Sequence, residues 1–294
     1  MSNRAEQRAC ETVLRLRDGR ALAYLERGDL AGTPILEFHG LPNPRQADTV
    51  PDAFLQDRGV RRITVDRPGV GFSDPQPGRT LLDWPQDVRQ LADALDLERF
   101  AVLGVSGGAP HALACAWALA DRVTAVALVS GIGPPDRPGA FEGMNRAASR
   151  VMLLARRAPW LARLTVGSVV AVDHFRPGTV LEGLLKALPE PDREVASRPQ
   201  VRESLLESYA LAFRQGTRGQ VRDWAILATP WGFLPEEVKV PVRLYHGEID
   251  DRVPLHHAQH LVSAIRDCKL TVYPGEGHMI IFERGEELLG TLAG

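Results

Sequence analysis

Residues 104–108 read Gly-Val-Ser-Gly-Gly and match the G-x-S-x-G pattern of a serine nucleophile. The largely apolar residues 100–105 before the serine predict a buried strand, and residues 109–120 after it predict a helix. A sharp turn between a strand and a helix requires small residues, because the two elements approach each other closely there. This context favours Ser106 as a nucleophile over the alternative, a serine without a catalytic role in a glycine-rich turn.

A serine hydroxyl needs a base to take its proton and a carboxylate to orient that base. Among the eight histidines, His278 stands in a loop after the last predicted strand, where it can reach over the edge of a sheet. It also follows the serine in the chain order Ser–acid–His that one class of serine enzymes uses. We therefore expect His278 to be the base, with an exposed loop histidine as the alternative. We expect His256, His257 and His260 at the surface of a helix.

The orienting carboxylate is expected just after the predicted strand at residues 241–246, because that position precedes His278 in the chain. Three candidates stand there, Glu248, Asp250 and Asp251. The residue types alone leave the choice among them open.

The oxyanion of a tetrahedral intermediate needs two N–H donors, and loss of one donor typically costs about 10²–10³ in rate. One donor is expected to be Gly107, the residue after the nucleophile. The other is expected in the loop that follows the apolar residues 34–39. Because Pro42 and Pro44 have no N–H, Leu41 and Asn43 remain.

The elements that would position these residues alternate between apolar strands and helices, which is typical of a parallel sheet covered on both faces. The first two strands read as a hairpin that turns at Asp18-Gly19. Residues 134–225 are helical by pattern, rich in arginine and without a strand signal. We therefore expect a core of residues 1–133 and 226–294 and an inserted helical lid of residues 134–225, with a separate helical domain as the alternative.

Five segments together resemble the α/β-hydrolase superfamily over nearly the whole chain: FHGLP at 38–42, DRPGVGFSD at 66–74, GVSGG at 104–108, HGEIDDRVP at 246–254 and GEGHMIIFE at 275–283. The resemblance implies an α/β fold with a mostly parallel, eight-stranded sheet flanked by helices, a helical lid and a Ser–acid–His triad. It implies Asp250 as the acid, through the family's D-x-x-V-P pattern, and favours Leu41 as the second oxyanion donor.

Composition excludes several other classes. The chain has 294 residues, 44% hydrophobic and 24% charged, and its net charge of −2 gives no basis for binding nucleic acid or an anionic membrane. The three cysteines, Cys10, Cys115 and Cys268, have neither metal-site nor disulfide spacing. No secretory signal or apolar membrane span is recognisable. We expect a cytoplasmic enzyme that uses no metal and no cofactor.

The substrate pocket is expected between the carboxyl edge of the sheet and the lid. Candidate lining residues are Phe141, Met144 and Phe175 in the lid and Trp231 just after it, which would favour a partly apolar small molecule. Ordinary packing between lid and core is the alternative explanation for each of these side chains.

The serine at position 106 separates this chain from haloalkane dehalogenases and epoxide hydrolases of the same fold, in which an aspartate attacks. The leading hypothesis is a serine hydrolase for an ester-type bond, a carboxylesterase or lactonase that forms an acyl-enzyme. One alternative is a C–C bond hydrolase or lyase with the same triad. A second is a ligand-sensing protein with slow or no turnover. The oligomeric state does not follow from the sequence.

Overall fold

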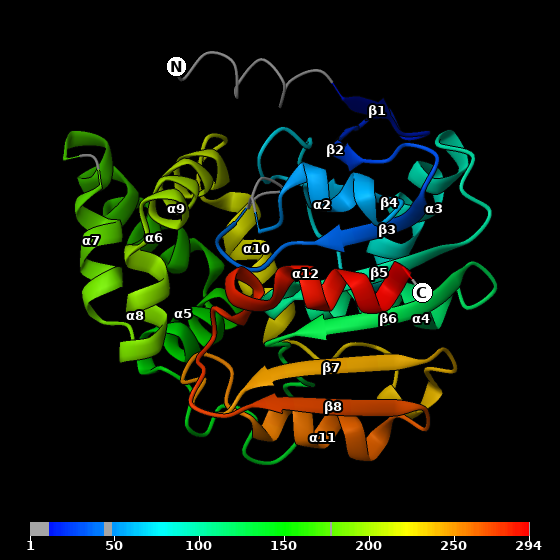
Figure 1. The fold of residues 1–294 in the computed structure, drawn as a ribbon. Coiled ribbons are helices and arrows are strands. Elements are labelled where there is room, and N and C mark those ends of the chain that lie inside the picture. The colour runs from blue at the N-terminus through cyan, green and yellow to red at the C-terminus, as the bar shows by residue number, and fades with distance from the viewer. Residues whose placement is uncertain (1–11, 44–48, 177, 294) are drawn as a thin grey trace.

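The computed structural model describes residues 12–43, 49–176 and 178–293. Its centre is an eight-stranded sheet with the order β1-β2-β4-β3-β5-β6-β7-β8 (Figure 1). The β1–β2 and β2–β4 pairs are antiparallel and the other five pairs are parallel. The strands are β1 Val13–Arg15, β2 Ala21–Gly28, β3 Thr33–Phe38, β4 Val60–Val65, β5 Phe100–Val105, β6 Val123–Val129, β7 Val242–Gly247 and β8 Cys268–Tyr273.

Helices cover both faces of this sheet, which explains why its central strands are apolar almost throughout. The helices α3 Trp84–Ala94, α4 Ala109–Ala118 and α11 His256–Ala264 pack on one face. The helices α2 Asp52–Asp57 and α12 Ile280–Ala293 pack on the other. In β5, Val102 belongs to the first core, whereas Ala101 and Leu103 belong to the second, as the alternation of a strand requires.

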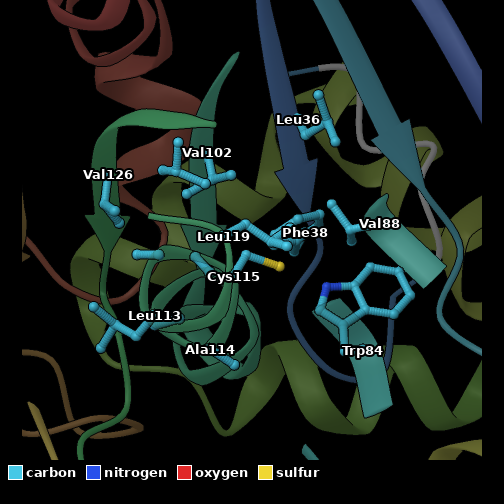
Figure 2. Packing of buried hydrophobic residues seen from close by; sticks show 14 of the residues in the cluster. Leu36, Phe38, Trp84, Val88, Val102, Leu113, Ala114, Cys115, Leu119 and Val126 are labelled. Carbon is cyan, nitrogen blue, oxygen red and sulfur yellow. The ribbon is translucent and has the colours of Figure 1, made fainter. Parts of the chain in front are cut away.

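The larger core is built around the strand and the helix that flank Ser106. Phe38 at the end of β3 meets Trp84 of α3 edge to face, with ring centroids 5.2 Å apart. Figure 2 shows both aromatic side chains in one buried cluster with Cys115 of α4 and Val102 of β5. Because all four side chains are buried, the ends of β3 and β5 are held against each other by close packing.

Six α-helices stand between β6 and β7 in the described part of the chain, and the described residues of that segment contain no strand. We call them the insertion helices. They lie beyond the carboxyl ends of the parallel strands, to which the arrowheads in Figure 1 point. Their bounds are α5 Arg146–Arg157, α6 Pro159–Phe175, α7 Thr179–Lys186, α8 Glu190–Ser197, α9 Pro199–Ala212 and α10 Arg218–Leu227.

The observed architecture confirms the predicted α/β-hydrolase fold, and the β1–β2 pairing confirms the predicted hairpin. Cys115 and Cys268 are free thiols, while Cys10 lies outside the described residues. Over the described part of the chain, no helix has both the length and the apolar character needed to cross a membrane.

Candidate active site

Ser106 stands at the sharp turn between β5 and α4, with a backbone φ of +53°. Non-glycine residues rarely adopt this left-handed region, and such strain is typical of functional turns. The turn is also crowded: a Cβ on Gly108 would lie 2.0 Å from the Phe38 carbonyl oxygen. A Cβ on Gly104 would lie 2.8 Å from the Cα of Ala109. The small residues of the motif are therefore required by the contact of strand, turn and helix.

His278 lies in the loop between β8 and α12, and this loop carries its ring to Ser106. Its Nε2 is 3.0 Å from the Ser106 Oγ, and its Nδ1 is 2.7 Å from the Asp250 Oδ2. The carbonyl of His278 accepts a hydrogen bond of 3.0 Å from the Ser130 hydroxyl. The three side chains thus form a continuous hydrogen-bonded chain from the serine to the carboxylate.

Asp250 is oriented by the turn in which it stands. Its Oδ1 accepts the backbone N–H groups of Arg252 at 2.9 Å and Val253 at 2.8 Å, which leaves Oδ2 for His278. The carboxylate is buried, with 5% of the residue exposed. Asp251, the neighbouring candidate, makes no hydrogen bond to His278 in the described structure. The register of the turn therefore selects Asp250.

The charges of His278 and Asp250 stabilise each other. Burial alone lowers the pKa of His278, but the adjacent Asp250 carboxylate outweighs burial and holds this pKa above its usual value. Burial alone would raise the pKa of Asp250, but His278 and the two backbone donors keep it below its usual value. The imidazole is thus a stronger base than a free histidine, which suits proton abstraction from Ser106.

Leu41 and Gly107 lie close to each other next to Ser106. A Cβ on Gly107 would lie 3.2 Å from the Leu41 Cγ, and one on Gly40 would lie 3.2 Å from the Ser106 Cβ. The Leu41 N–H makes no hydrogen bond to any described residue. Gly107 stands in the first turn before α4, where helical N–H groups have no intrahelical acceptor. Among the described residues, neither N–H has a backbone acceptor outside its own element, so both remain candidate oxyanion donors.

An aspartate from the insertion helices also holds the histidine loop, which the sequence analysis did not identify. Asp192 of α8 accepts the N–H of His278 through Oδ2 at 3.0 Å and that of Met279 through Oδ1 at 2.9 Å. It is 1% exposed, and a Cβ on Gly277 would lie 2.4 Å from its Oδ1. Local sequence carries no signal for this contact, because Asp192 and His278 are 86 residues apart.

A second aspartate of the insertion helices supports the loop after β3. Asp223 of α10 accepts a hydrogen bond of 2.9 Å from the Arg67 Nε and a second hydrogen bond from Arg79. Arg67 in turn donates to the carbonyls of His39 at 2.6 Å and Gly40 at 3.3 Å. Burial alone would raise the pKa of Asp223, but the two arginines hold it far below its usual value. This network ties the insertion to the loop that presents Leu41.

A pocket of about 160 Å³ opens over Ser106 and is mostly apolar. Leucines of α7 and α9 form one wall, and the start of α12 forms another. Besides Gly40, Leu41, Ser106 and His278, its lining residues are Pro42, Asn43, Val105, Leu184, Leu185, Leu188, Leu205, Tyr209, Arg252, Met279, Ile281 and Phe282.

The four residues expected to line the pocket do not line it. Trp231 is buried in the main core beside Phe233, and Phe175 is 83% exposed at the end of α6. Phe141 and Met144 belong with Leu41 to a separate hydrophobic cluster and are not among the residues that line the pocket. The expectation was wrong because it chose aromatic and Met side chains by type, whereas the pocket wall is decided by which helix faces Ser106.

One histidine expected at the surface is also placed differently. His257 is only 1% exposed, and its Nδ1 accepts the Gly133 N–H at 3.1 Å. Burial lowers the pKa of His257 to about 2, so this ring is neutral and acts as a backbone acceptor.

Comparisons with known proteins agree with this architecture. A family model described as alpha/beta hydrolase fold matches residues 33–285. YcgS, an uncharacterized hydrolase of Bacillus subtilis (strain 168), is 25% identical and covers 94% of this chain and 96% of its own. The 2-hydroxymuconate semialdehyde hydrolase of Pseudomonas putida is 25% identical, over 87% of this chain and 84% of its own.

Solved structures show the same fold. An esterase from Exiguobacterium antarcticum has a TM-score of 0.69 at 20% identity, over 96% of this chain and 97% of that one. The sheet order, the strained turn at Ser106 and the match over residues 33–285 lead to one conclusion. The chain belongs to the alpha/beta hydrolase fold family.

Proposed function

We propose that the protein is a serine hydrolase that cleaves an ester-type bond, as a carboxylesterase or a lactonase. The observation that carries the proposal is the chain of hydrogen bonds from the Ser106 Oγ to the His278 Nε2 at 3.0 Å and from the His278 Nδ1 to Asp250 at 2.7 Å. These distances are within the range needed for proton transfer from a nucleophile to its base.

The proposed reaction has two halves. In the first, the Ser106 Oγ attacks the carbonyl carbon, its proton passes to the His278 Nε2, and the Leu41 and Gly107 N–H groups bind the oxyanion. The intermediate collapses, and His278 protonates the departing alcohol oxygen. In the second half, His278 takes a proton from water, and the resulting hydroxide attacks the acyl-enzyme. The C–Oγ bond then breaks, His278 returns the proton to the Ser106 Oγ, and the acid is released. One water is consumed, and the serine is restored.

The pocket supports a substrate with an apolar acyl or alkyl group. Leu184 of α7 and Leu205 of α9 line one wall of the pocket. Asn43 and Arg252 are polar residues of the lining. We propose residues 134–225 as a lid over this pocket. On this proposal, esters with short to medium aliphatic chains bind better than bulky aromatic esters.

A fluorophosphonate probe tests the nucleophile directly. We expect covalent labelling of the wild-type protein and none of the Ser106→Ala variant. The variant Ser168→Ala, which changes a serine of α6 outside the pocket, is expected to label normally. Labelling that persists in Ser106→Ala, or no turnover of nitrophenyl esters of two to eight carbons (roughly the range that the pocket accommodates), would overturn the proposal.

Cleavage of a C–C bond is the second candidate. It is favoured by the similarity to 2-hydroxymuconate semialdehyde hydrolase over 84% of that relative. The same three side chains would serve, since a serine–histidine pair can also activate water. Turnover of 2-hydroxymuconate semialdehyde, compared with nitrophenyl butyrate under one set of conditions, decides between the two candidates. A kcat/KM that is higher for 2-hydroxymuconate semialdehyde than for nitrophenyl butyrate would assign the protein to C–C bond cleavage.

A further inference from the structure

A second, larger cavity of about 420 Å³ lies between the turn at residues 68–79 and the helices α5, α6 and α10. It shares no lining residue with the pocket over Ser106. Its wall contains five arginines and no aspartate or glutamate. The arginines are Arg79, Arg156, Arg163, Arg218 and Arg222.

Backbone carbonyls hold most of these guanidinium groups in place. Arg222 donates to the carbonyls of Arg79 at 2.6 Å and Gly78 at 2.8 Å. Arg156 donates to the carbonyl of Ala228 at 2.8 Å, and the Arg163 Nε lies 3.3 Å from the carbonyl of Pro159. A carbonyl orients a guanidinium but does not neutralise its charge, so these side chains are placed without losing their attraction for an anion.

The positive charge of the cavity is largely uncompensated. Within the described residues, Arg156, Arg163, Arg218 and Arg222 form no salt bridge, and Arg218 makes no hydrogen bond through its side chain. Burial and the neighbouring Arg79 lower the pKa of Arg222 and outweigh Asp83 and Asp223, which raise it. The first turn of α10, at Arg218 and Gly219, also lines the cavity and adds the positive end of a ten-residue helix.

Arg79 is the most deeply buried arginine of the cavity wall. It is 3% exposed and lines the cavity, and Asp223 binds its Nη2. Its Nη1 is buried and has no hydrogen-bond partner among the described residues. Because Asp223 compensates the charge of Arg79, the uncompensated charge of the cavity comes from the other four arginines.

We propose that this cavity binds an organic phosphate. Phosphate oxygens accept the paired, charge-assisted hydrogen bonds that guanidinium groups donate. The volume of about 420 Å³ is far larger than a phosphate group needs and falls in the range of small-molecule pockets. The prolines at 68, 75 and 77, with Ala155 and Val221, offer an apolar surface for the carbon skeleton of the ligand.

Calorimetric titration at physiological salt tests the site without any reference to turnover. The probes are phenyl phosphate, inorganic phosphate and benzoate. We expect phenyl phosphate to bind to the wild-type protein more tightly than inorganic phosphate does, and benzoate to bind more weakly than either. Absence of measurable phenyl phosphate binding at millimolar concentration would overturn the proposal. Inorganic phosphate that binds as tightly would contradict the assignment to an organic ligand.

The matched variants are two double substitutions of equal charge. Arg156→Gln with Arg218→Gln removes two arginines of the cavity, and Arg150→Gln with Arg157→Gln removes two exposed arginines of α5 outside it. We expect the first pair to weaken phenyl phosphate binding by about tenfold or more, because charge-assisted hydrogen bonds are lost, and the second pair to leave it nearly unchanged. Equal weakening by both pairs would show general charge attraction and overturn the site. Arg218→Gln alone provides a variant that disturbs no described hydrogen bond, should the double variant fold poorly.

Discussion

Two buried aspartates of the insertion helices contact the core, and they do so by different chemistry. Asp192 of α8 accepts two backbone N–H groups of the histidine loop. Asp223 of α10 pairs with the side chains of Arg67 and Arg79 behind the loop after β3. Both are at most 1% exposed. One carboxylate therefore positions a loop, whereas the other neutralises two buried cations.

The difference teaches what each contact stabilises. Removal of Asp223 leaves two guanidinium groups in the interior without their counter-charge, so its loss weakens the whole fold. Removal of Asp192 leaves only two neutral N–H groups unpaired, and these belong to the loop that carries His278. The insertion thus contributes to stability through one aspartate and to the geometry of the candidate active site through the other.

The largest expected effect is that of Asp223→Ala on stability. We expect the free energy of unfolding to fall by about 3–5 kcal/mol, because the buried Arg67 and Arg79 lose their counter-charge. Urea denaturation followed by circular dichroism measures this change. The control is Glu190→Ala on α8, whose ion pair with Arg193 is exposed and whose loss is expected to cost less than about 1 kcal/mol. Equal losses from the two substitutions would contradict the difference drawn between buried and exposed pairs.

Asp192→Ala is expected to reduce activity more than stability. We expect kcat to fall by about tenfold to a hundredfold, because a small displacement of His278 disturbs proton transfer, while KM stays nearly constant. The free energy of unfolding is expected to fall by about 1–3 kcal/mol. Steady-state kinetics on a nitrophenyl ester measures both constants, and Glu194→Ala on the same helix is the control. A change in KM alone would show that Asp192 acts on the pocket rather than on His278.

Gly277→Ala is expected to act through Asp192. The added Cβ would lie 2.4 Å from the Asp192 Oδ1, so the carboxylate and the loop cannot keep their present contact. We expect a loss of about tenfold in kcat in the wild-type background and a smaller loss in the Asp192→Ala background. A double-mutant cycle measures the coupling, expected at about 0.5–3 kcal/mol. Additive losses would mean that the glycine is needed for another reason.

The smallest expected effect is on the pH profile of kcat/KM. Asp250 raises the pKa of His278, and the more distant Asp192 raises it by a lesser contribution. His278 must be neutral to accept a proton, so activity is lost as the pH falls through its pKa. Loss of the neighbouring charge lowers that pKa, so the residual activity of Asp250→Asn, expected to be about 10⁴-fold reduced, should show an acid limb at lower pH. Asp192→Asn should move it less, and an acid limb that stays in place in Asp250→Asn would contradict this assignment.

The sequence alone predicted the fold and named the three residues that the structure brings together. Ser106 stands in a motif whose strand, turn and helix are contiguous in the chain, and Asp250 and His278 follow later strands in the expected order. Such signals are readable because each depends on local geometry, a turn that needs glycines or a loop that follows a strand.

Tertiary structure decided which helices face the candidate nucleophile. Helical periodicity predicts that a helix has an apolar face but not which neighbour it meets, so Leu184 and Leu205 line the pocket in place of Phe141 and Phe175. The contacts of Asp192 with His278 and of Asp223 with Arg67 join residues 86 and 156 positions apart. Partners at such separations are chosen by the packing of the insertion helices on the sheet, which no local pattern in the sequence specifies.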